Sequence, residues 1–226
     1  MTRMNQFFTV RAEDIDGNAH VNNAVYVGYF DEVARGHLLA EGFGFFDFGS
    51  GPFLRTAEYT YDSPLFFGEI INVGSDLEDR GSGGIFLNQE MVCSGERVSR
   101  ARLEYGLVRR NGGKNQDPAG CVREFERQRL AFVESNRLGP QALRELGVGL
   151  YVRSAHYAFL SPFLIENPEV AGTLSYEKGV RALFKQTMSS GGGEVARADL
   201  VYAFVDLKTR KPTRPPAGVL GNLKNS

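Results

Sequence analysis

Three side chains that could perform acyl chemistry lie close together near the start of the chain, Asp16, Asn18 and His20. They alternate along the sequence, so on an extended segment all three would project to one face. A carboxylate can attack a carbonyl carbon or activate water, an amide can orient the carbonyl, and an imidazole can move a proton near neutral pH. The spacing therefore predicts an acyl-transfer site with Asp16 as nucleophile or general base.

The same stretch, residues 13–35, also has the features of a turn in front of a helix. Asn22 and Asn23 are favoured helix N-caps, and Asp14 begins a run of turn-forming residues. Asp14 is expected to point away from Asp16 and to have a structural role. Local rules alone favour the capped turn, so the choice between turn and site depends on the rest of the chain.

The elements that would position the cluster can be read from the hydrophobic pattern. Residues 23–41 have apolar side chains at helical spacing, which predicts a one-sided helix directly after the cluster. The start of such a helix offers backbone N–H groups and positive dipole character, which can stabilise an oxyanion. Strand-like segments are predicted at 7–12, 52–62, 69–79, 84–94 and 98–108, with Gly-rich turns between several of them.

An internal repeat bears on how many sites to expect. Three stretches recur in the same order, at offsets of about 95 to 98 positions. They are residues 29–35 with 124–130, residues 55–65 with 153–163, and residues 89–105 with 186–202. Ordered matches of this kind predict two copies of one structural unit.

The two copies are predicted to span residues 1–112 and 113–226, joined by the turn formers in "RRNGGKNQDPAG". The second copy has a predicted helix at about residues 122–137, a short extra turn in "PQALREL" and three or four strands. This is an α+β pattern in which one long helix packs on an antiparallel sheet. The two copies are expected to pair as a pseudo-dimer within the chain. Association of several chains into a homo-oligomer is compatible with this arrangement.

The stretch "DIDGNAHVNNAVYVGYFDEVAR" resembles the motif before the helix of hotdog-fold acyl thioesterases, closest to the acyl-ACP thioesterases of plants and bacteria. Their motif, D-x-D-x-N-x-H-V-N-N, is matched at every specified position from Asp14 to Asn23. The resemblance implies a tandem (double) hotdog fold and thioester hydrolysis that needs no metal and no cofactor. It also implies catalytic roles for Asp16, Asn18 and His20.

A further catalytic acid is implied by the resemblance on the strand after the helix. It falls on Asp62, where the family has Glu, and Ser63 stands where the family often has Cys. The serine argues against a cysteine nucleophile at this point. Substrate contacts are expected from Asn22, Asn23 and Ser63.

The second copy lacks the catalytic pattern. Leu160 takes the position of Asp62, no histidine precedes the helix, and Asp117 is expected to be a turn residue rather than a second nucleophile. This copy is therefore predicted to be catalytically silent and to form one wall of the acyl pocket. The aromatic-rich residues 41–53 either shape the acyl channel or form a packed loop, and His37 is expected at the surface or at an interface.

The composition of the chain limits the classes of partner that can be expected. With a formal net charge of −1 and 23% charged residues, the chain has no electrostatic sign of a nucleic-acid partner. No apolar run approaches a membrane span of about 20 residues, and the first residues lack a signal-peptide core, so a cytoplasmic protein is predicted. Acyl-CoA or acyl-ACP is the expected substrate, with acyl carrier protein as a partner in the second case. A hotdog dehydratase or other acyl-thioester enzyme, or a non-catalytic acyl-binding module, is the alternative.

Overall fold

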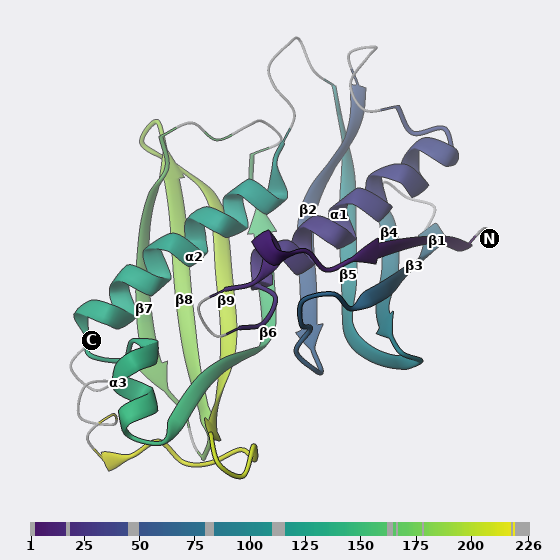
Figure 1. The fold of residues 1–226 in the computed structure, drawn as a ribbon. Helices are drawn as coiled ribbons and strands as arrows, with labels where there is room; N and C mark the ends of the chain where they lie inside the picture. Colours follow the sequence, from purple (N-terminus) through teal and green to yellow (C-terminus); the bar gives the residue numbers. More distant parts are fainter. Residues whose placement is uncertain are drawn as a thin grey trace.

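The protein, seen in a computed structural model, consists of two similar halves, each with one long helix lying across strands of a sheet (Figure 1). The structure describes residues 3–16, 19–44, 50–79, 84–109, 116–161, 165, 167–177, 179–217 and 219.

The first half is built on helix α1 (Asn23–Ala40), which confirms the predicted helix. The strands 52–62, 69–79, 84–94 and 98–108 are confirmed to within two residues, whereas the opening strand begins at Arg3 rather than residue 7 because it pairs along its whole length with a later strand. The elements are a short 3-10 helix η1 (Ala12–Asp14), β1 (Arg3–Thr9), β2 (Ser50–Tyr61), β3 (Ile70–Asp79), β4 (Gly84–Cys93) and β5 (Glu96–Arg109).

The second half has the same plan. The short turn predicted in "PQALREL" is a helix, but the long helix starts four residues earlier than the predicted residue 122. Its start is set by Pro118 in the first turn, where proline is tolerated, and by Asp117, whose carboxylate accepts from the Gly120 N–H at 2.8 Å. The elements are α2 (Pro118–Ser135), α3 (Pro140–Glu145), β6 (Val148–Phe159), β7 (Glu169–Tyr176), β8 (Arg181–Ser190) and β9 (Gly193–Asp206).

One antiparallel sheet runs through both halves in the order β1-β3-β4-β5-β2-β6-β9-β8-β7. The halves join where β2 pairs with β6, with residues 56–60 opposite residues 154–158. Both long helices lie on the same face of this sheet and pack against each other (Figure 1). The predicted fold, a tandem hotdog in which each sheet half wraps one long helix, is confirmed.

Aromatic rings form a continuous row beneath the two helices at this junction. Phe30 of α1 lies 5.8 Å from Tyr59 of β2, measured between ring centroids. Tyr59 lies 5.9 Å from Tyr157 of β6, which lies 6.1 Å from Phe125 of α2. All four residues are at most 2% exposed, so the halves share one hydrophobic core.

Matching residues of the two halves make matching polar contacts. The Gln89 side-chain amide donates to the Phe30 carbonyl at 3.1 Å, and the Gln186 amide donates to the Phe125 carbonyl at 2.9 Å. Both glutamines are buried on a sheet strand and reach the middle of a long helix. The repeat seen in the sequence is therefore a repeat of side-chain interactions as well as of fold.

His37 differs from the expectation of a surface or interface residue. It is 1% exposed in the last turns of α1, and its Nδ1 atom lies 3.0 Å from Ser75 Oγ on β3. The prediction was wrong because the face of α1 that packs on the sheet continues through this position.

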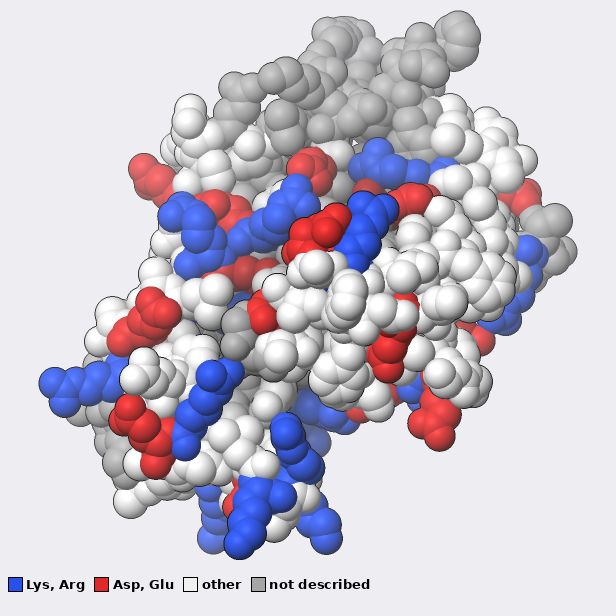
Figure 2. All heavy atoms as spheres, viewed as in Figure 1, with Lys and Arg blue, Asp and Glu red and all other residues white. Residues whose placement is uncertain are grey.

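Acidic and basic side chains are mixed over the face that carries the helices (Figure 2). On α2, for example, Arg127 pairs with Glu124 at 2.6 Å. No helix in the described part of the chain is both long and apolar enough to cross a membrane.

The paired glutamines give a test of the shared architecture. We expect Gln89→Ala and Gln186→Ala each to lower the free energy of unfolding by about 1–3 kcal/mol, because each loses a buried hydrogen bond and leaves a small cavity. Denaturant unfolding measures both, with the exposed neighbour Lys185→Ala as a control expected to stay within about 0.5 kcal/mol of wild type. A loss confined to one of the two glutamines would contradict their equivalence.

Candidate active site

The segment before α1 folds as a tight turn, not as the extended segment that the alternation predicted. The Asp16 N–H donates to the His20 carbonyl at 2.9 Å, and the Ala19 N–H donates to the Asp16 carbonyl at 3.0 Å. Ala19 has a φ of 62°, in the left-handed region, and Ile15 forms an antiparallel bridge with Val21. The turn, rather than alternation along a strand, brings Asp16 and His20 together.

The Asp16 and His20 side chains lie side by side at this turn. His20 Nδ1 is 3.7 Å from Asp16 Oδ1, and the two side chains are 20% and 24% exposed for His20 and Asp16 respectively. The His20 Nε2 atom is buried and has no hydrogen-bond partner among the described residues. The hydrogen-bond partner of His20 Nδ1 is the Val21 carbonyl oxygen at 3.3 Å, with the Asp16 carboxylate slightly farther away. An imidazole that is held through Nδ1 near a carboxylate, with Nε2 unpartnered among the described residues, is arranged to exchange a proton with a ligand. Asn18 lies outside the described residues.

The second half also reaches this turn. Tyr151 of β6 places its ring 5.8 Å from the His20 ring. In Figure 1 the start of α1 lies at the middle of the molecule, beside β6. The turn is therefore bordered by both halves.

The first turn of α1 has a defined set of hydrogen bonds. Asn22 is the N-cap, as expected, and its Oδ1 atom accepts from the Ala24 N–H at 2.8 Å while its carbonyl accepts from the Val25 N–H at 3.0 Å. Asn23 is the first helical residue rather than a cap. Its backbone N–H has no acceptor within the described part of the chain. A donor is thus left at the positive end of the helix dipole, where an oxyanion would be stabilised.

Asp14 has the structural role expected of it. Its Oδ2 atom accepts from the Arg11 N–H at 2.8 Å and from the Tyr29 hydroxyl at 2.7 Å. Its carbonyl also accepts from the Asn22 N–H at 3.1 Å. These bonds connect η1, the turn and α1, and they fix where the helix begins.

Asp62 and its repeat counterpart occupy the same backbone position in the two halves. The Asp62 N–H donates to the Val98 carbonyl and the Leu160 N–H donates to the Val195 carbonyl, both at 2.9 Å. The Asp62 carboxylate accepts from Arg97 Nε at 3.0 Å. Only the first half thus has a carboxylate at this position.

The residues after Asp62 lie against the start of α1. The Tyr26 hydroxyl donates to the Ser63 carbonyl at 3.3 Å, and the Val21 N–H donates to the Leu65 carbonyl at 2.9 Å. Ser63 therefore contacts α1 through its backbone, and the residue as a whole is exposed. The site has β2 and its following loop as one wall.

A buried acid on α2 also belongs to this region, and the sequence analysis missed it. Glu126 and Arg129 have side chains 6% and 9% exposed, and Arg129 Nη2 lies 3.5 Å from Glu126 Oε1. Burial raises the pKa of Glu126, whereas the Arg129 guanidinium and the polar groups of Asn22 and Ala24 lower it. The signal in the sequence was two charged residues on the core-facing side of a predicted helix.

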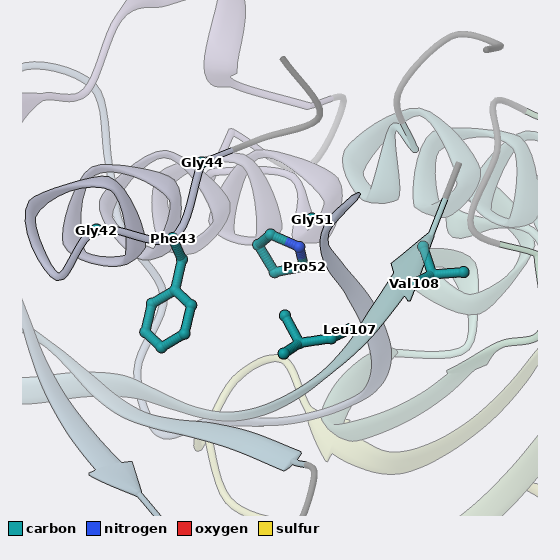
Figure 3. Close-up of a pocket in the computed structure, with 7 residues that line it drawn as sticks. All are labelled: Gly42, Phe43, Gly44, Gly51, Pro52, Leu107 and Val108. Carbon is teal, nitrogen blue, oxygen red and sulfur yellow. The ribbon is translucent and has the colours of Figure 1, made fainter. Parts of the chain in front are cut away.

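A separate pocket of about 460 Å³ lies at the other end of α1 (Figure 3). Since an 18-residue helix is about 27 Å long, this pocket is distant from the Asp16–His20 turn. Residues 45–49 of the proposed acyl-channel segment lie outside the described residues, so a role of 41–53 in the acyl channel stays a prediction. The pocket is lined by Gly42, Phe43, Gly44, Gly51, Pro52, Leu107 and Val108.

The cysteines do not provide a nucleophile at the site. Cys93 and Cys121 are both buried, and burial raises the pKa of the Cys121 thiol to about 12. At neutral pH this residue is a thiol, which is the unreactive form. Within the described ranges, no three His, Cys, Asp or Glu side chains gather as metal ligands would.

Comparison with solved structures supports the fold. An acyl-ACP thioesterase from Bacteroides thetaiotaomicron is similar with a TM-score of 0.68 and 12% identity, covering 88% of this chain and 97% of that one. The 12:0-ACP thioesterase from Umbellularia californica has a TM-score of 0.66 and 12% identity, covering 93% and 94%. A Lactobacillus plantarum protein named as an oleoyl thioesterase has a TM-score of 0.73 and 5% identity, covering 95% and 96%.

The family is shown by sequence. No curated protein sequence matches the chain. The profile of the thioesterase-like superfamily matches it twice, over residues 10–119 and 117–223, one match for each half. The chain belongs to the thioesterase-like superfamily, as a tandem pair of its hotdog units.

Proposed function

We propose that this protein hydrolyses acyl thioesters of CoA or acyl carrier protein, at one site where Asp16, Asn18 and His20 precede α1. The observation that carries the proposal is the His20 side chain before α1. Its Nδ1 atom lies 3.7 Å from Asp16 Oδ1, and its buried Nε2 atom has no partner among the described residues. Hydrolysis fits the superfamily, and the acyl-ACP substrate class is carried over from the named neighbours.

The chemistry follows from the polar groups around the turn. The thioester carbonyl oxygen would bind at the Asn23 N–H, where the helix dipole stabilises the negative charge formed on it. Asp16 then attacks the carbonyl carbon, or takes a proton from a water that attacks it, with His20 and Asn18 orienting the reacting groups. The C–S bond breaks and the thiol leaves with a proton. Where water attacks, this step releases the acid directly. Where Asp16 attacks, the acyl-aspartyl anhydride is then cleaved by water, which releases the acid and restores the Asp16 carboxylate. A thiolate leaves readily, so a weak acid such as His20 suffices.

Single turnovers in H₂¹⁸O test whether Asp16 is the nucleophile. Water that cleaves the acyl-enzyme at the Asp16 carboxyl carbon leaves ¹⁸O in Asp16, so label in Asp16 identifies the nucleophile. Direct attack by water, and cleavage of the acyl-enzyme at the acyl carbon, both put ¹⁸O into the product in the first turnover, so these two routes are separated by trapping the acyl-enzyme.

The first functional prediction concerns the catalytic pair. We expect Asp16→Asn and His20→Ala each to lower kcat/KM for acyl-thioester hydrolysis by about 10²–10⁴, because each removes a group that moves or accepts a proton. Thiol release from a panel of acyl-CoA and acyl-ACP substrates measures the effect. An enoyl thioester as product would indicate a dehydratase, and tight binding without thiol release would indicate an acyl-binding module.

Asp117→Asn is the matched control for Asp16→Asn. Asp117 stands before α2 as the N-cap, and asparagine caps equally well, so neither stability nor activity should change. Wild-type activity in Asp16→Asn would refute the proposed role of Asp16. A large loss of activity in Asp117→Asn would instead place the site in the second half.

A second prediction concerns Asp62. Since its carboxylate is held by Arg97 at 3.0 Å, we expect Asp62→Asn to lower kcat/KM by no more than about tenfold, less than Asp16→Asn. The same assay with Arg97→Gln separates the two contributions. Losses in Asp62→Asn as large as those in Asp16→Asn would instead make Asp62 a full catalytic partner.

A further inference from the structure

We propose that four buried polar side chains beside the start of α1 form a subsite for the acyl group, where they bind a hydroxyl or keto oxygen carried on the acyl chain. This polar cluster consists of Tyr61 on β2, Tyr157 on β6, Tyr202 on β9 and Arg129 on α2. The inference rests on the proposed function, because it names the class of acyl group that the proposed thioesterase would take.

Each member of the polar cluster has a buried polar atom without a hydrogen-bond partner among the described residues. These atoms are the three tyrosine hydroxyls and Arg129 Nη1. The four residues are at most 7% exposed. Buried polar groups in proteins are normally hydrogen-bonded, and leaving one unpaired is costly. Four such groups in one region indicate a ligand that supplies their partner.

The strand pairing brings two of the tyrosines to the same stretch of sheet. β6 lies between β2 and β9 in the strand order. Thr60 of β2 lies opposite Ser154 of β6, and Tyr202 of β9 lies opposite Val152 of β6. Tyr61 and Tyr202 therefore stand on either side of β6 at the place where its register with β9 shifts, between Val152 and Ser154.

The other two members reach this region from the helix layer and from β6 itself. The Arg129 guanidinium carbon lies 5.8 Å from the centre of the Tyr202 ring. The Tyr157 ring lies 5.9 Å from the Tyr59 ring, which stacks 6.4 Å from the Tyr61 ring. Burial raises the pKa of all three unpartnered hydroxyls and the Arg129 charge lowers it in part, which agrees with a guanidinium near each of them. At neutral pH the hydroxyls are protonated and can donate.

The polar cluster begins next to the proposed catalytic groups. The Tyr61 ring lies 5.3 Å from the ring of Tyr26, which is in the first turn of α1. The Tyr26 hydroxyl donates to the carbonyl of Ser63 in the loop that forms one wall of the site. An acyl group whose thioester oxygen binds at the Asn23 N–H can therefore extend toward the cluster.

The charges in the cluster favour a neutral oxygen over a carboxylate. Arg129 Nη2 lies 3.5 Å from Glu126 Oε1, so the arginine charge is already offset. A carboxylate on the acyl chain would be repelled by Glu126, whereas a hydroxyl or keto oxygen would not. The guanidinium can only donate hydrogen bonds, and the tyrosine hydroxyls can donate as well. An uncharged oxygen that accepts from them is the ligand that this set fits.

The corresponding region of the other half lacks this set. There, only the hydroxyl of Tyr105, the repeat counterpart of Tyr202, is buried and unpartnered among the matching tyrosine positions. Phe159 takes the position of Tyr61 and has no hydroxyl. The arginine on α1, Arg35, donates to the Gln116 carbonyl at 3.1 Å. Within the described residues, the complete polar cluster thus occurs beside the proposed site and not at its counterpart.

A matched substrate panel tests the inference. The protein is assayed with acyl-CoA thioesters of one chain length whose chains are unsubstituted, hydroxylated, oxidised to a ketone or ended by a carboxylate, with the oxygen placed at successive carbons. We expect kcat/KM for the best hydroxyacyl or ketoacyl substrate to exceed that for the unsubstituted and carboxylate-ended chains about 10- to 100-fold, because those chains leave the buried donors unpaired or bring a second negative charge. The hydroxyl and keto arms then identify which oxygen binds.

Variants that remove one hydroxyl assign the preference to the cluster. Tyr202→Phe and Tyr61→Phe keep the ring, and we expect each to lower the ratio of kcat/KM between the preferred and the unsubstituted substrate about 3- to 10-fold. Tyr105→Phe is the matched control and should leave this ratio within about twofold of wild type. Thermal unfolding of all three variants checks that they fold.

Binding gives a readout that does not depend on turnover. Thioether analogues of acyl-CoA, with and without the preferred oxygen, cannot be hydrolysed, and calorimetry measures their affinities for wild type and Tyr202→Phe. We expect the oxygen to lower Kd about tenfold or more in wild type, and by a smaller factor in Tyr202→Phe.

Several outcomes would overturn the inference. A wild-type protein without the preference, or a preference unchanged in Tyr202→Phe and Tyr61→Phe, would remove the cluster from substrate binding. An equal change in Tyr105→Phe would make the effect a general one of core tyrosines, and fastest hydrolysis of the carboxylate-ended chain would refute the neutral oxygen. If the protein hydrolyses no thioester, the proposed function fails, and the thioether affinities still decide whether the cluster binds an oxygen.

Discussion

The pairing of β2 with β6 is the constraint on which the rest of the structure depends. It joins two sheets into one, with residues 56–60 opposite residues 154–158, and so places two helices side by side on one face. The row of four buried rings, two from the helices and two from the sheet, packs the halves against each other. With the helices held together in this way, residues in the middle of α2 meet the start of α1. The candidate site exists because of that crossing.

At the start of α1 the important question is which backbone N–H groups have hydrogen-bond acceptors. A helix begins with N–H groups that have no partner inside the helix, and buried groups of this kind are normally satisfied. The Asn22 side chain and carbonyl satisfy the Ala24 and Val25 N–H groups, while the turn before them satisfies its own through Asp16 and His20. The Asn23 N–H has no acceptor within the described part of the chain. This donor, next to the Asp16–His20 turn, is where we propose that the carbonyl oxygen binds.

Much of this architecture could be predicted from the sequence, and the parts that could not share a physical cause. The spacing of hydrophobic residues identifies α1 and most strands. The internal repeat predicts two structural units, because residues at matching positions make matching contacts, as Gln89 and Gln186 do. The side-by-side arrangement of Asp16 and His20 followed from a turn through Ala19 that alternation along the chain does not indicate. Glu126 was missed because its burial depends on the packing of α2 against α1, about a hundred positions away in the sequence, and pattern rules see only residues that are close in sequence.

The contrast between the two halves supports the proposal of a single active site. Both halves keep the features that hold a helix on the sheet, namely the buried glutamine, the ring row and an acid–arginine pair on the long helix. They differ where the helix starts: Asn22 is a neutral cap that can accept and donate, whereas Asp117 is a charged cap that only accepts. The acids on the facing helices, both with a pKa raised by burial, respond in the same sense: repulsion from Asp117 raises the pKa of Asp31 further, whereas the polar groups of Asn22 and Ala24 lower the pKa of Glu126. We therefore expect the start of α1, rather than the start of α2, to accommodate a developing negative charge.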